Sequence, residues 1–418
     1  MQFGCTLAGV AMYCIRTIEN NLRKVSEQFR VVLITGPRQV GKTTLLRHLG
    51  GPDRRFVTLD DPAVLQIARE DPGLFFQRFP PPITIDEIQY APGLLTYIKM
   101  IVDDDGTPGR FWLTGSQQFP LMKGVSESLA GRIAIINILG LSYAEADGRG
   151  SMSLPFIPGG PGFEERIRDA ARPDLQDVYA RIFRGSMPEL VLNPDLDPAV
   201  WFGSYVQTYI QRDVRDLARV GDEMAFLRFL RATAARTGTL LNLADLARDA
   251  DIAPNTAKNW MSILVTSGIV HLLEPWFRNQ TKRIVKAPKI YFLDTGLCAY
   301  LTGWPSASTL ETGAMTGQIL ETWVVAELLK TFWHNAKRAP LYFMRDRDGR
   351  EIDILIQNGD TLHPFEVKKS AMPGRDDIRH FQMLDSTGMN VGEGGVFCLA
   401  GEFMPLNERN RSIPITAI

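Results

Sequence analysis

A glycine-rich loop between an apolar segment and a helical segment constrains the fold of this chain more than any other feature. Residues 31–44 read VVLITGPRQVGKTT, and a helical pattern continues to residue 49. A buried-type strand, a G-x-x-x-x-G-K-T loop and a helix, in this order, are the context that a phosphate-binding loop requires. Gly36 and Gly41 permit backbone angles that a Cβ atom forbids, so N–H groups can turn inward around a phosphate. We therefore expect an α/β fold with a parallel sheet and a nucleoside triphosphate site.

Two side chains of this loop have defined roles in such a site. The Lys42 ammonium would reach the β- and γ-phosphates, and the Thr43 hydroxyl would coordinate Mg²⁺. A chance Gly-Lys-Thr turn is the alternative, and the strand and helix that flank the loop argue against it. The residues predicted to bind the nucleotide are Gly36, Pro37, Arg38, Gln39, Val40, Gly41, Lys42, Thr43 and Thr44.

Length and composition limit the remaining possibilities. A chain of 418 residues exceeds what one hydrophobic core supports, so about two to four domains are expected. The formal net charge of -1 gives no global positive field for nucleic acid, although a local basic surface is still allowed. The 4 cysteines lack the spacing of a zinc site or a disulfide framework, and no apolar run approaches the ~18 residues of a membrane span. These features fit a cytoplasmic protein, in which we expect residues 1–11 to be a disordered extension.

An acidic pair completes the predicted nucleotide site. Residues 82–87 read PITIDE, an apolar strand that ends in two carboxylates. In phosphate-loop enzymes the strand beside the loop delivers an Asp to the Mg²⁺ shell, and Asp86 fits this role. Glu87 lies one residue further and can orient and deprotonate the attacking water. The alternative, a helix N-cap, is weakened by the presence of the loop.

Two further residues are candidates near the γ-phosphate. Residues 110–116, RFWLTGS, read as a strand that ends in small hydroxyl residues, and Ser116 is our candidate between the γ-phosphate and the water. Arg132 follows a turn of small residues and would neutralise charge on the γ-phosphate, in its own subunit or toward a neighbouring one. A surface ion pair is the alternative for Arg132.

Four strings in this region resemble those of the AAA-type ATPases of a large, mostly uncharacterised prokaryotic group. They are GPRQVGKTT at 36–44, IDEIQYAP at 85–92, TGS at 114–116 and SLAGR at 128–132. The resemblance implies ATP rather than GTP, which agrees with the lack of an Asn-Lys-x-Asp guanine motif. It also implies that Arg38 and Gln39 belong to the family pattern of the loop.

Turn residues and helical periodicity divide the middle of the chain. Residues 155–162 form a Gly- and Pro-rich break, and we expect the ATPase domain to cover residues 12–146. A linker and helical segment would follow at 147–200, and a helical or winged-helix domain at 201–300. Within it, residues 201–219 predict a long helix whose alternating charges favour a solvated face over a binding role.

Two short helices and a strand outline a winged helix. Residues 243–250 and 255–264 predict the helices, with Asn255 as the N-cap of the second, and 269–273 predict the strand. If this unit touches DNA, its groove-facing residues are Asn255, Thr256, Lys258 and Asn259. The same outline also serves protein–protein packing, so both partners remain open. A basic stretch that could hold phosphates follows at Arg278, Lys282, Arg283, Lys286 and Lys289.

Residues 301–418 contain a second group of chemically suggestive residues. A periodic helix at 317–329 carries Glu321, a strand at 350–356 carries Asp353, and Asn358-Gly359 predicts a hairpin. Pairing across this hairpin brings Asp353 near Glu366 and Lys368, which are two apart and share one face of their strand.

Carboxylates that hold Mg²⁺ and a lysine that positions water are what metal-assisted phosphodiester cleavage needs. The arrangement resembles the PD-(D/E)xK nuclease superfamily, with Asp353 as the motif aspartate, Glu366 and Lys368 as the (D/E)xK pair and Glu321 as the helix carboxylate. The alternative is a buried ion-pair cluster on an inert nuclease-like scaffold.

The expected function is a Mg²⁺-dependent ATPase whose nucleotide state repositions the C-terminal half. One hypothesis makes the output an ATP-gated nuclease acting through Asp353, Glu366 and Lys368. The other makes it a regulatory switch that binds DNA or protein, or that self-associates, with an inert nuclease-like domain. A phosphate-loop kinase is disfavoured by the Asp86–Glu87 pair.

Overall fold

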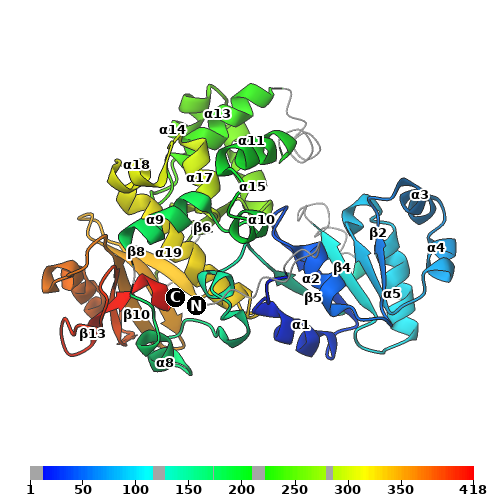
Figure 1. Ribbon diagram of the computed structural model, residues 1–418, viewed down its shortest axis with the longest axis horizontal. Coiled ribbons are helices and arrows are strands. Elements are labelled where there is room, and N and C mark those ends of the chain that lie inside the picture. Colours follow the sequence, from blue (N-terminus) through cyan, green and yellow to red (C-terminus); the bar gives the residue numbers. More distant parts are fainter. Residues whose placement is uncertain (1–12, 116–127, 173, 210–221, 279–285) are drawn as a thin grey trace.

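The computed structural model describes residues 13–115, 128–172, 174–209, 222–278 and 286–418. We call residues 13–146 the N-terminal region, 147–300 the middle region and 301–418 the C-terminal region. The N-terminal region stands to one side of the molecule, and the other two pack together on the opposite side (Figure 1). The expected extension at 1–11 and the candidate Ser116 lie outside the described residues.

A parallel sheet forms the N-terminal region, as predicted, and it has five strands, of which the one at Ile133–Asn137 was not expected. Its strands are β1 (Val31–Thr35), β2 (Arg55–Thr58), β3 (Ile83–Asp86), β4 (Phe111–Gly115) and β5 (Ile133–Asn137), in the spatial order β2-β3-β4-β1-β5. One expectation is wrong: β3 does not lie beside β1, because β4 inserts between them and pairs in parallel with both. The strand that carries Asp86 is therefore one position further from the loop than expected.

The two faces of this sheet belong to different cores. Around it lie α1 (Ile18–Ser26), α2 (Lys42–Leu49), α3 (Pro62–Glu70), α4 (Pro72–Arg78), η1 (Ile88–Tyr90) and α5 (Leu94–Asp104). Val31 and Leu33 pack into a local cluster with residues of α4 and α5. Val32 and Ile34 point to the other face, since side chains alternate along a strand, and join a core that continues through the middle region to Ile418. The N-terminal region therefore shares its core with the rest of the chain.

The middle region is mostly helical. Its elements after α7 (Tyr143–Ala146) are η2 (Gly150–Met152), α8 (Phe163–Arg168), α9 (Leu175–Arg184), α10 (Pro188–Leu192), α11 (Pro198–Tyr209), α13 (Glu223–Ala234), α14 (Leu243–Ala250), α15 (Pro254–Thr266), β6 (Val270–Leu273), β7 (Lys289–Phe292) and α17 (Thr295–Leu301). The strands β6 and β7 pair antiparallel, and Leu240 adds a bridge to Lys289. Asn255 is not the N-cap of α15, because Pro254 begins the helix and Ala253 caps it.

A second sheet forms the C-terminal region. Its elements are α18 (Ala307–Thr312), α19 (Thr316–Trp333), β8 (Leu341–Arg345), β9 (Glu351–Asn358), β10 (Thr361–Val367), η4 (Arg375–Ser386), β11 (Asn390–Val391), β12 (Gly394–Cys398), β13 (Asn410–Pro414) and η5 (Ile415–Ala417). The strands β8, β9 and β10 form an antiparallel meander, whereas β12 and β13 continue the sheet in parallel. The predicted hairpin at Asn358 and Gly359 is confirmed, with Asn358 paired to Thr361.

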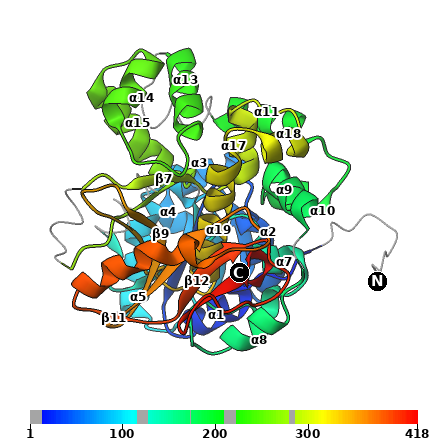
Figure 2. The ribbon, with the colours of Figure 1, turned by 90° about the vertical axis from the view of Figure 1, so that its left-hand side faces the viewer.

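The helix α19 lies at the centre of the molecule. Its core-facing residues include Val324 and Leu328, and it lies between the second sheet and the middle-region helices (Figure 2). Its C-terminal end reaches the segment that follows β5, as described below. Among the described residues, no helix has the length and apolar character needed to cross a membrane.

Candidate functional sites

The glycine-rich loop is held in its shape by close backbone contacts. Gly36 has φ +148°, and a Cβ atom built there would lie 2.1 Å from the Ile138 carbonyl oxygen, so only glycine fits. Gly41 is the N-cap of α2 with φ 89°, and Gln39 also has a positive φ of 64°. The loop therefore turns tightly and leads directly into the N-terminus of α2, as a phosphate-binding loop requires.

The Lys42 side chain lies within this loop. The residue is buried, and its ammonium donates hydrogen bonds to the carbonyl oxygens of Gly36 at 3.0 Å and Pro37 at 2.6 Å. These contacts hold the positive charge over the concave side of the loop, where a phosphate would lie.

A hydrogen-bonded chain joins the loop to the acidic pair. The Thr43 hydroxyl donates to Asp86 Oδ1 at 2.9 Å, and the Thr114 hydroxyl donates to the same oxygen at 2.5 Å. The Glu87 N–H in turn donates to Thr114 Oγ1 at 3.0 Å. The two predicted Mg²⁺ ligands, Thr43 in the first turn of α2 and Asp86 at the end of β3, are therefore in direct contact, although β4 separates β3 from β1.

Glu87 has a left-handed backbone conformation with φ 60°. This conformation is uncommon outside glycine, and here Thr114 holds it through the N–H contact. The Gln89 side-chain amide donates to Glu87 Oε2 and so fixes the carboxylate. Thr114 and Gln89 were missed as functional residues in the sequence, although both lie within the family strings.

A cavity of about 460 Å³, within the size range of small-molecule sites, adjoins this group of residues. Lys42, Thr43 and Glu87 form one side of it. The remaining walls come from the N-terminal segment at Tyr13 and from α10 at Pro188, neither of which was expected to contribute. The cavity is therefore built jointly by the N-terminal and middle regions.

The loop also touches the middle region directly. Gly268 follows α15 with φ +70°, and a Cβ atom there would lie 2.9 Å from Pro37 Cδ. On the other side of the loop, Pro188 Cγ lies 3.8 Å from the position of a Cβ at Gly41. The loop is therefore in close contact with the middle region at both of these points.

Arg132 does not lie at the nucleotide cavity. It precedes β5, and its carbonyl accepts the N–H of Val31, at the opposite end of β1 from the loop. Five residues of strand span about 16 Å, so the expected role of Arg132 within its own subunit is wrong. The guanidinium instead forms an exposed two-point ion pair with Asp103, at 2.5 and 3.0 Å. This contact is the surface ion pair that the sequence analysis gave as the alternative for Arg132.

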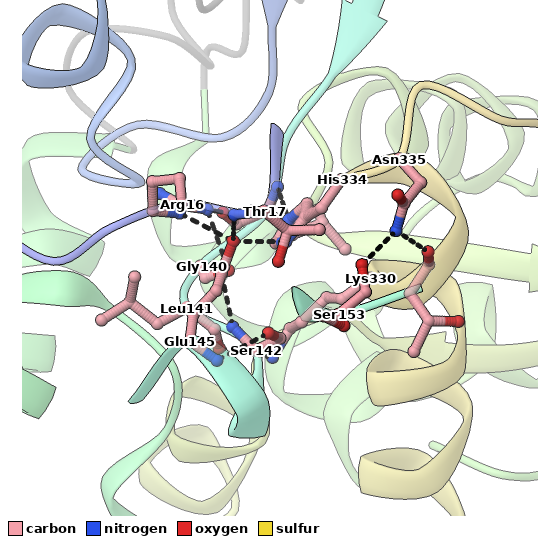
Figure 3. Close-up of polar contacts among 12 residues, drawn as sticks. Arg16, Thr17, Gly140, Leu141, Ser142, Glu145, Ser153, Lys330, His334 and Asn335 are labelled. Carbon is pink, nitrogen blue, oxygen red and sulfur yellow. Dashed lines mark hydrogen bonds and ion pairs between the residues drawn. The ribbon is translucent and has the colours of Figure 1, made fainter. Parts of the chain in front are cut away.

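A buried polar network lies behind the loop (Figure 3). Arg16 donates to the carbonyl oxygens of Val40 at 2.9 Å and Leu139 at 2.8 Å, and its Nε lies 3.2 Å from Glu145 Oε1. Glu145 is fully buried and also accepts the N–H groups of Thr17 and Ser142, both at 2.8 Å. Burial alone would raise the pKa of Glu145, but the charge of Arg16 and the hydrogen bond from His334 outweigh it and lower the pKa.

The C-terminal end of α19 completes this network. The His334 ring accepts the Leu139 N–H at Nε2 and lies 3.2 Å from Glu145 through Nδ1, so Nδ1 is the nitrogen placed to donate. Burial lowers the pKa of His334. Lys330 donates to the Leu141 carbonyl at 3.0 Å and to Glu327 at 2.7 Å. The helix α19 is therefore tied to the segment that supports the loop (Figure 3).

The predicted carboxylates of the C-terminal region do converge. Lys368 Nζ lies 2.7 Å from Glu366 Oε2 and 3.9 Å from Asp353 Oδ2. Glu321 reaches the same group from α19, where its Oε1 accepts the Tyr291 hydroxyl at 2.5 Å. Burial, followed by the charge of Asp353, raises the pKa of Glu366 to about 8 and that of Glu321 to about 7.

Lys289 lies among these carboxylates, which corrects its expected place in a phosphate-holding basic stretch. It is 3 % exposed, and its Nζ lies 2.5 Å from Glu351, 2.9 Å from Glu321 and 4.0 Å from Asp353. Lys282 and Arg283 of that stretch lie outside the described residues. Within the described part of the chain, no group of three or more His, Cys, Asp or Glu side chains has the geometry to hold a metal ion.

Comparison with known proteins agrees with the geometry of the N-terminal region. An AAA domain family model matches residues 28–146, and two domains of unknown function, DUF8612 and DUF4143, match residues 175–308 and 316–418. Together with the parallel sheet and the loop, the first match supports a P-loop ATPase domain at residues 28–146.

The whole chain also has relatives. The uncharacterized proteins Rv2008c of Mycobacterium tuberculosis and Mb2031c of Mycobacterium bovis are each 31% identical over 357 residues, which are 84% of this chain and 73% of the relative. The chain belongs to the family of these two mycobacterial proteins.

Solved structures are more distant. The Walker-type ATPase PABY2304 of Pyrococcus abyssi matches 68% of this chain and 94% of its own, with 15% identity and a TM-score of 0.42. A RuvB variant of Thermotoga maritima matches 61% of this chain and 88% of its own, with 15% identity and a TM-score of 0.30.

Proposed function

We propose that this chain hydrolyses ATP with Mg²⁺ and uses the nucleotide cycle to shift the middle and C-terminal regions against the loop. The observation that carries the proposal is the contact between the Thr43 hydroxyl and Asp86 at 2.9 Å, beside a cavity that Lys42 and Glu87 also line. The cavity is lined by a cation-coordinating hydroxyl, an ammonium and a candidate base, and the Asp86 carboxylate lies directly behind the hydroxyl. These are the parts of a phosphoryl-transfer site.

The oxygens of Thr43 and Asp86 fit a magnesium ion, since Mg²⁺ prefers hydroxyl and carboxylate ligands together with phosphate oxygens. When bound, the ion would supply neutralisation of the phosphate charge. Lys42 would bind the β- and γ-phosphates, and the N–H groups of the loop would orient them. Glu87 would accept a proton from the attacking water, with its carboxylate held by Gln89.

We also propose roles at the γ-phosphate for two further residues. Ser116 would lie between the γ-phosphate and the water, since it follows the last described residue of β4. Arg132 would act only toward a neighbouring subunit, which requires self-association and release of its ion pair with Asp103.

The coupling proposal rests on how the cavity is built. Because Pro188 of α10 and Gly268 after α15 both lie against the loop, contacts with the γ-phosphate would bias the middle region in a way that the diphosphate does not. A second route runs from the Val40 carbonyl through Arg16 and Glu145 to His334 at the end of α19. Hydrolysis would therefore move the C-terminal half through these two contacts.

DNA is the partner that we propose for the moving half, with a protein partner as the alternative. One support is α15, whose exposed face carries Asn255, Lys258 and Asn259. The other is the antiparallel pair of strands β6 and β7 that follows α15, to which Leu240 adds a bridge. This order of helices and strands is the outline of a winged helix. A cytoplasmic location goes with this partner.

A metal-dependent nuclease is the second candidate function. The convergence of Asp353, Glu366 and Lys368 favours it. The metal itself does not fit the site, however, because the Lys289 ammonium lies against Glu321 and Glu351, where a cation would bind. The ATP-driven switch is therefore the function that we propose first.

The test is phosphate release from ATP by Glu87→Gln. We expect the variant to bind ATP as the parent does but to turn it over about 10²–10⁴-fold more slowly, the usual contribution of a general base. Glu70→Gln is the matched control, since Glu70 is exposed on α3, and it should keep the parent rate. Equal turnover by Glu87→Gln and the parent would remove Glu87 as the base.

A further inference from the structure

Lys289 is a buried ammonium that crosses from the middle region into the C-terminal region. It is the first residue of β7, yet its side chain contacts carboxylates of α19 and β9. Burying an ammonium is unfavourable unless carboxylates compensate it closely. Here three carboxylates lie within 4.0 Å, those of Glu321, Glu351 and Asp353.

The same three carboxylates would repel one another without a cation between them. Glu351 and Asp353 are two residues apart on β9, so they share one face of the sheet, and Glu321 approaches that face from α19. A convergence of carboxylate oxygens is the environment that divalent cations occupy in proteins. In this chain the Lys289 ammonium supplies the positive charge instead.

Both carboxylate oxygens of Asp353 already have partners in the protein. Its Oδ1 faces Lys289, whereas its Oδ2 accepts the Val367 N–H at 3.0 Å and faces Lys368 at 3.9 Å. A divalent cation could therefore reach Asp353 only by displacing a lysine that the fold holds in place.

The strand β7 fixes Lys289 from both sides. Lys289 pairs with Leu273 of β6, and Leu240 forms a bridge to it on the other edge. Tyr291 lies two residues further on the same face of β7, is fully buried, and donates its hydroxyl to Glu321. Two side chains of one strand thus hold the same carboxylate of α19.

We propose that the Lys289 ammonium takes the place of a divalent cation, so that this carboxylate cluster is an internal latch between β7 of the middle region and α19 and β9 of the C-terminal region. The cluster then binds no metal ion while β7 is in place. Removing the ammonium leaves Asp353, Glu351 and Glu321 uncompensated, and we expect their side chains then to move together around a divalent cation. The proposal does not depend on ATP hydrolysis, because the cluster and the nucleotide cavity share no residue.

The experiment measures bound Mn²⁺ by electron paramagnetic resonance in the full-length chain. All variants carry Lys42→Ala and no nucleotide is added, so that nucleotide-bound Mn²⁺ does not contribute. Asp353→Asn separates the cluster from any Mn²⁺ held at Thr43 and Asp86. At about 1 mM Mn²⁺, a concentration at which weak carboxylate sites fill, the Lys42→Ala chain should show no Mn²⁺ signal that Asp353→Asn removes. Adding Lys289→Met should create such a signal.

Lys286→Met is the matched control, because Lys286 is exposed three residues earlier and should leave Mn²⁺ binding unchanged. The thermal unfolding midpoint provides a second measurement. Mn²⁺ should raise the midpoint of the Lys289→Met chain and not that of its parent, since a ligand stabilises only the state that binds it.

Two results would overturn the proposal. One is Asp353-dependent Mn²⁺ binding in the chain that keeps Lys289. The other is a folded Lys289→Met chain that binds no more Mn²⁺ than its parent. If Lys289→Met does not fold even with Mn²⁺, Asp353-dependent Mn²⁺ binding in the chain with native Lys289 still tests the proposal. ATP turnover in a chain with native Lys42 tests the proposed function separately.

Discussion

The nucleotide cavity and the carboxylate cluster both contain a buried lysine close to acidic residues, but the two lysines have different partners. In the cavity, Lys42 donates to neutral carbonyl oxygens, and Asp86 accepts from two hydroxyls. In the cluster, Lys289 lies directly against the carboxylates. The ammonium of the cavity therefore lies within the loop that would hold the phosphates, whereas the ammonium of the cluster lies against three carboxylates of the protein. A buried lysine near carboxylates therefore does not by itself indicate a binding site. The groups that its ammonium contacts distinguish a binding site from a structural cluster.

The largest expected effect concerns stability. Lys289→Met should lower the free energy of unfolding by about 3–5 kcal/mol, because it leaves buried carboxylates without compensation. Lys42→Met should lower it by only about 1–2 kcal/mol, because it removes hydrogen bonds to carbonyl groups. Urea unfolding of the two variants measures the difference. Equal losses would erase the distinction between the two lysines.

For nucleotide affinity, substitution of Lys42 should have the larger effect, whereas substitution of Lys289 has the larger effect on stability. Lys42→Ala should weaken ATP binding on the order of 10–100-fold, the value of a hydrogen bond to a charged group. Lys24→Ala, on the exposed face of α1, is the control and should bind as the parent does. Equilibrium dialysis with labelled ATP gives both dissociation constants. Undiminished affinity in Lys42→Ala would mean that the lysine does not contact the nucleotide.

A smaller effect tests the contact between the loop and the middle region. Gly268→Ala should weaken ATP binding roughly fivefold, corresponding to about 1 kcal/mol, because its Cβ would press on Pro37 Cδ at 2.9 Å. Gly303→Ala has a similar positive φ of +75° but nothing within 4 Å of its Cβ, so it carries the same backbone strain without the contact. Titration of each variant with ATP separates strain from contact. Equal affinities in the two variants would show that the contact does not reach the nucleotide.

The smallest effect is a pH dependence from His334, whose pKa is lowered by burial. The unfolded chain takes up a proton near pH ~6.5 that the folded histidine resists, so the free energy of unfolding should fall as the pH drops below that value. His334→Gln should reduce this slope between about pH 8 and pH 5. His48→Gln, at an exposed position, keeps His334 and should keep the parent slope. An unchanged slope in His334→Gln would locate the titrating group elsewhere.

The sequence predicted those features that depend on short stretches of chain. The strand, loop and helix around Lys42 and the hairpin at Asn358 and Gly359 are encoded by neighbouring residues, and the structure confirms both elements. The shared face of Glu366 and Lys368 follows from the period of a strand in the same way.

Features that depend on distant parts of the chain were not predictable in this way. Arg16 meets the Leu139 carbonyl 123 positions away, and no local pattern signals that contact. Lys289 reads as part of a basic surface because its burial is decided by Glu321 and Glu351, which lie far along the chain. The insertion of β4 between β1 and β3 likewise depends on how strands pair across the sheet.

The most direct test of the central claim is calorimetric titration of the folded, full-length chain with ATP in the presence of Mg²⁺. The account predicts saturable heat for a single nucleotide site, and loss of that heat when Lys42 is replaced by Ala. A well-folded chain that releases or absorbs no heat with ATP and Mg²⁺ would contradict it.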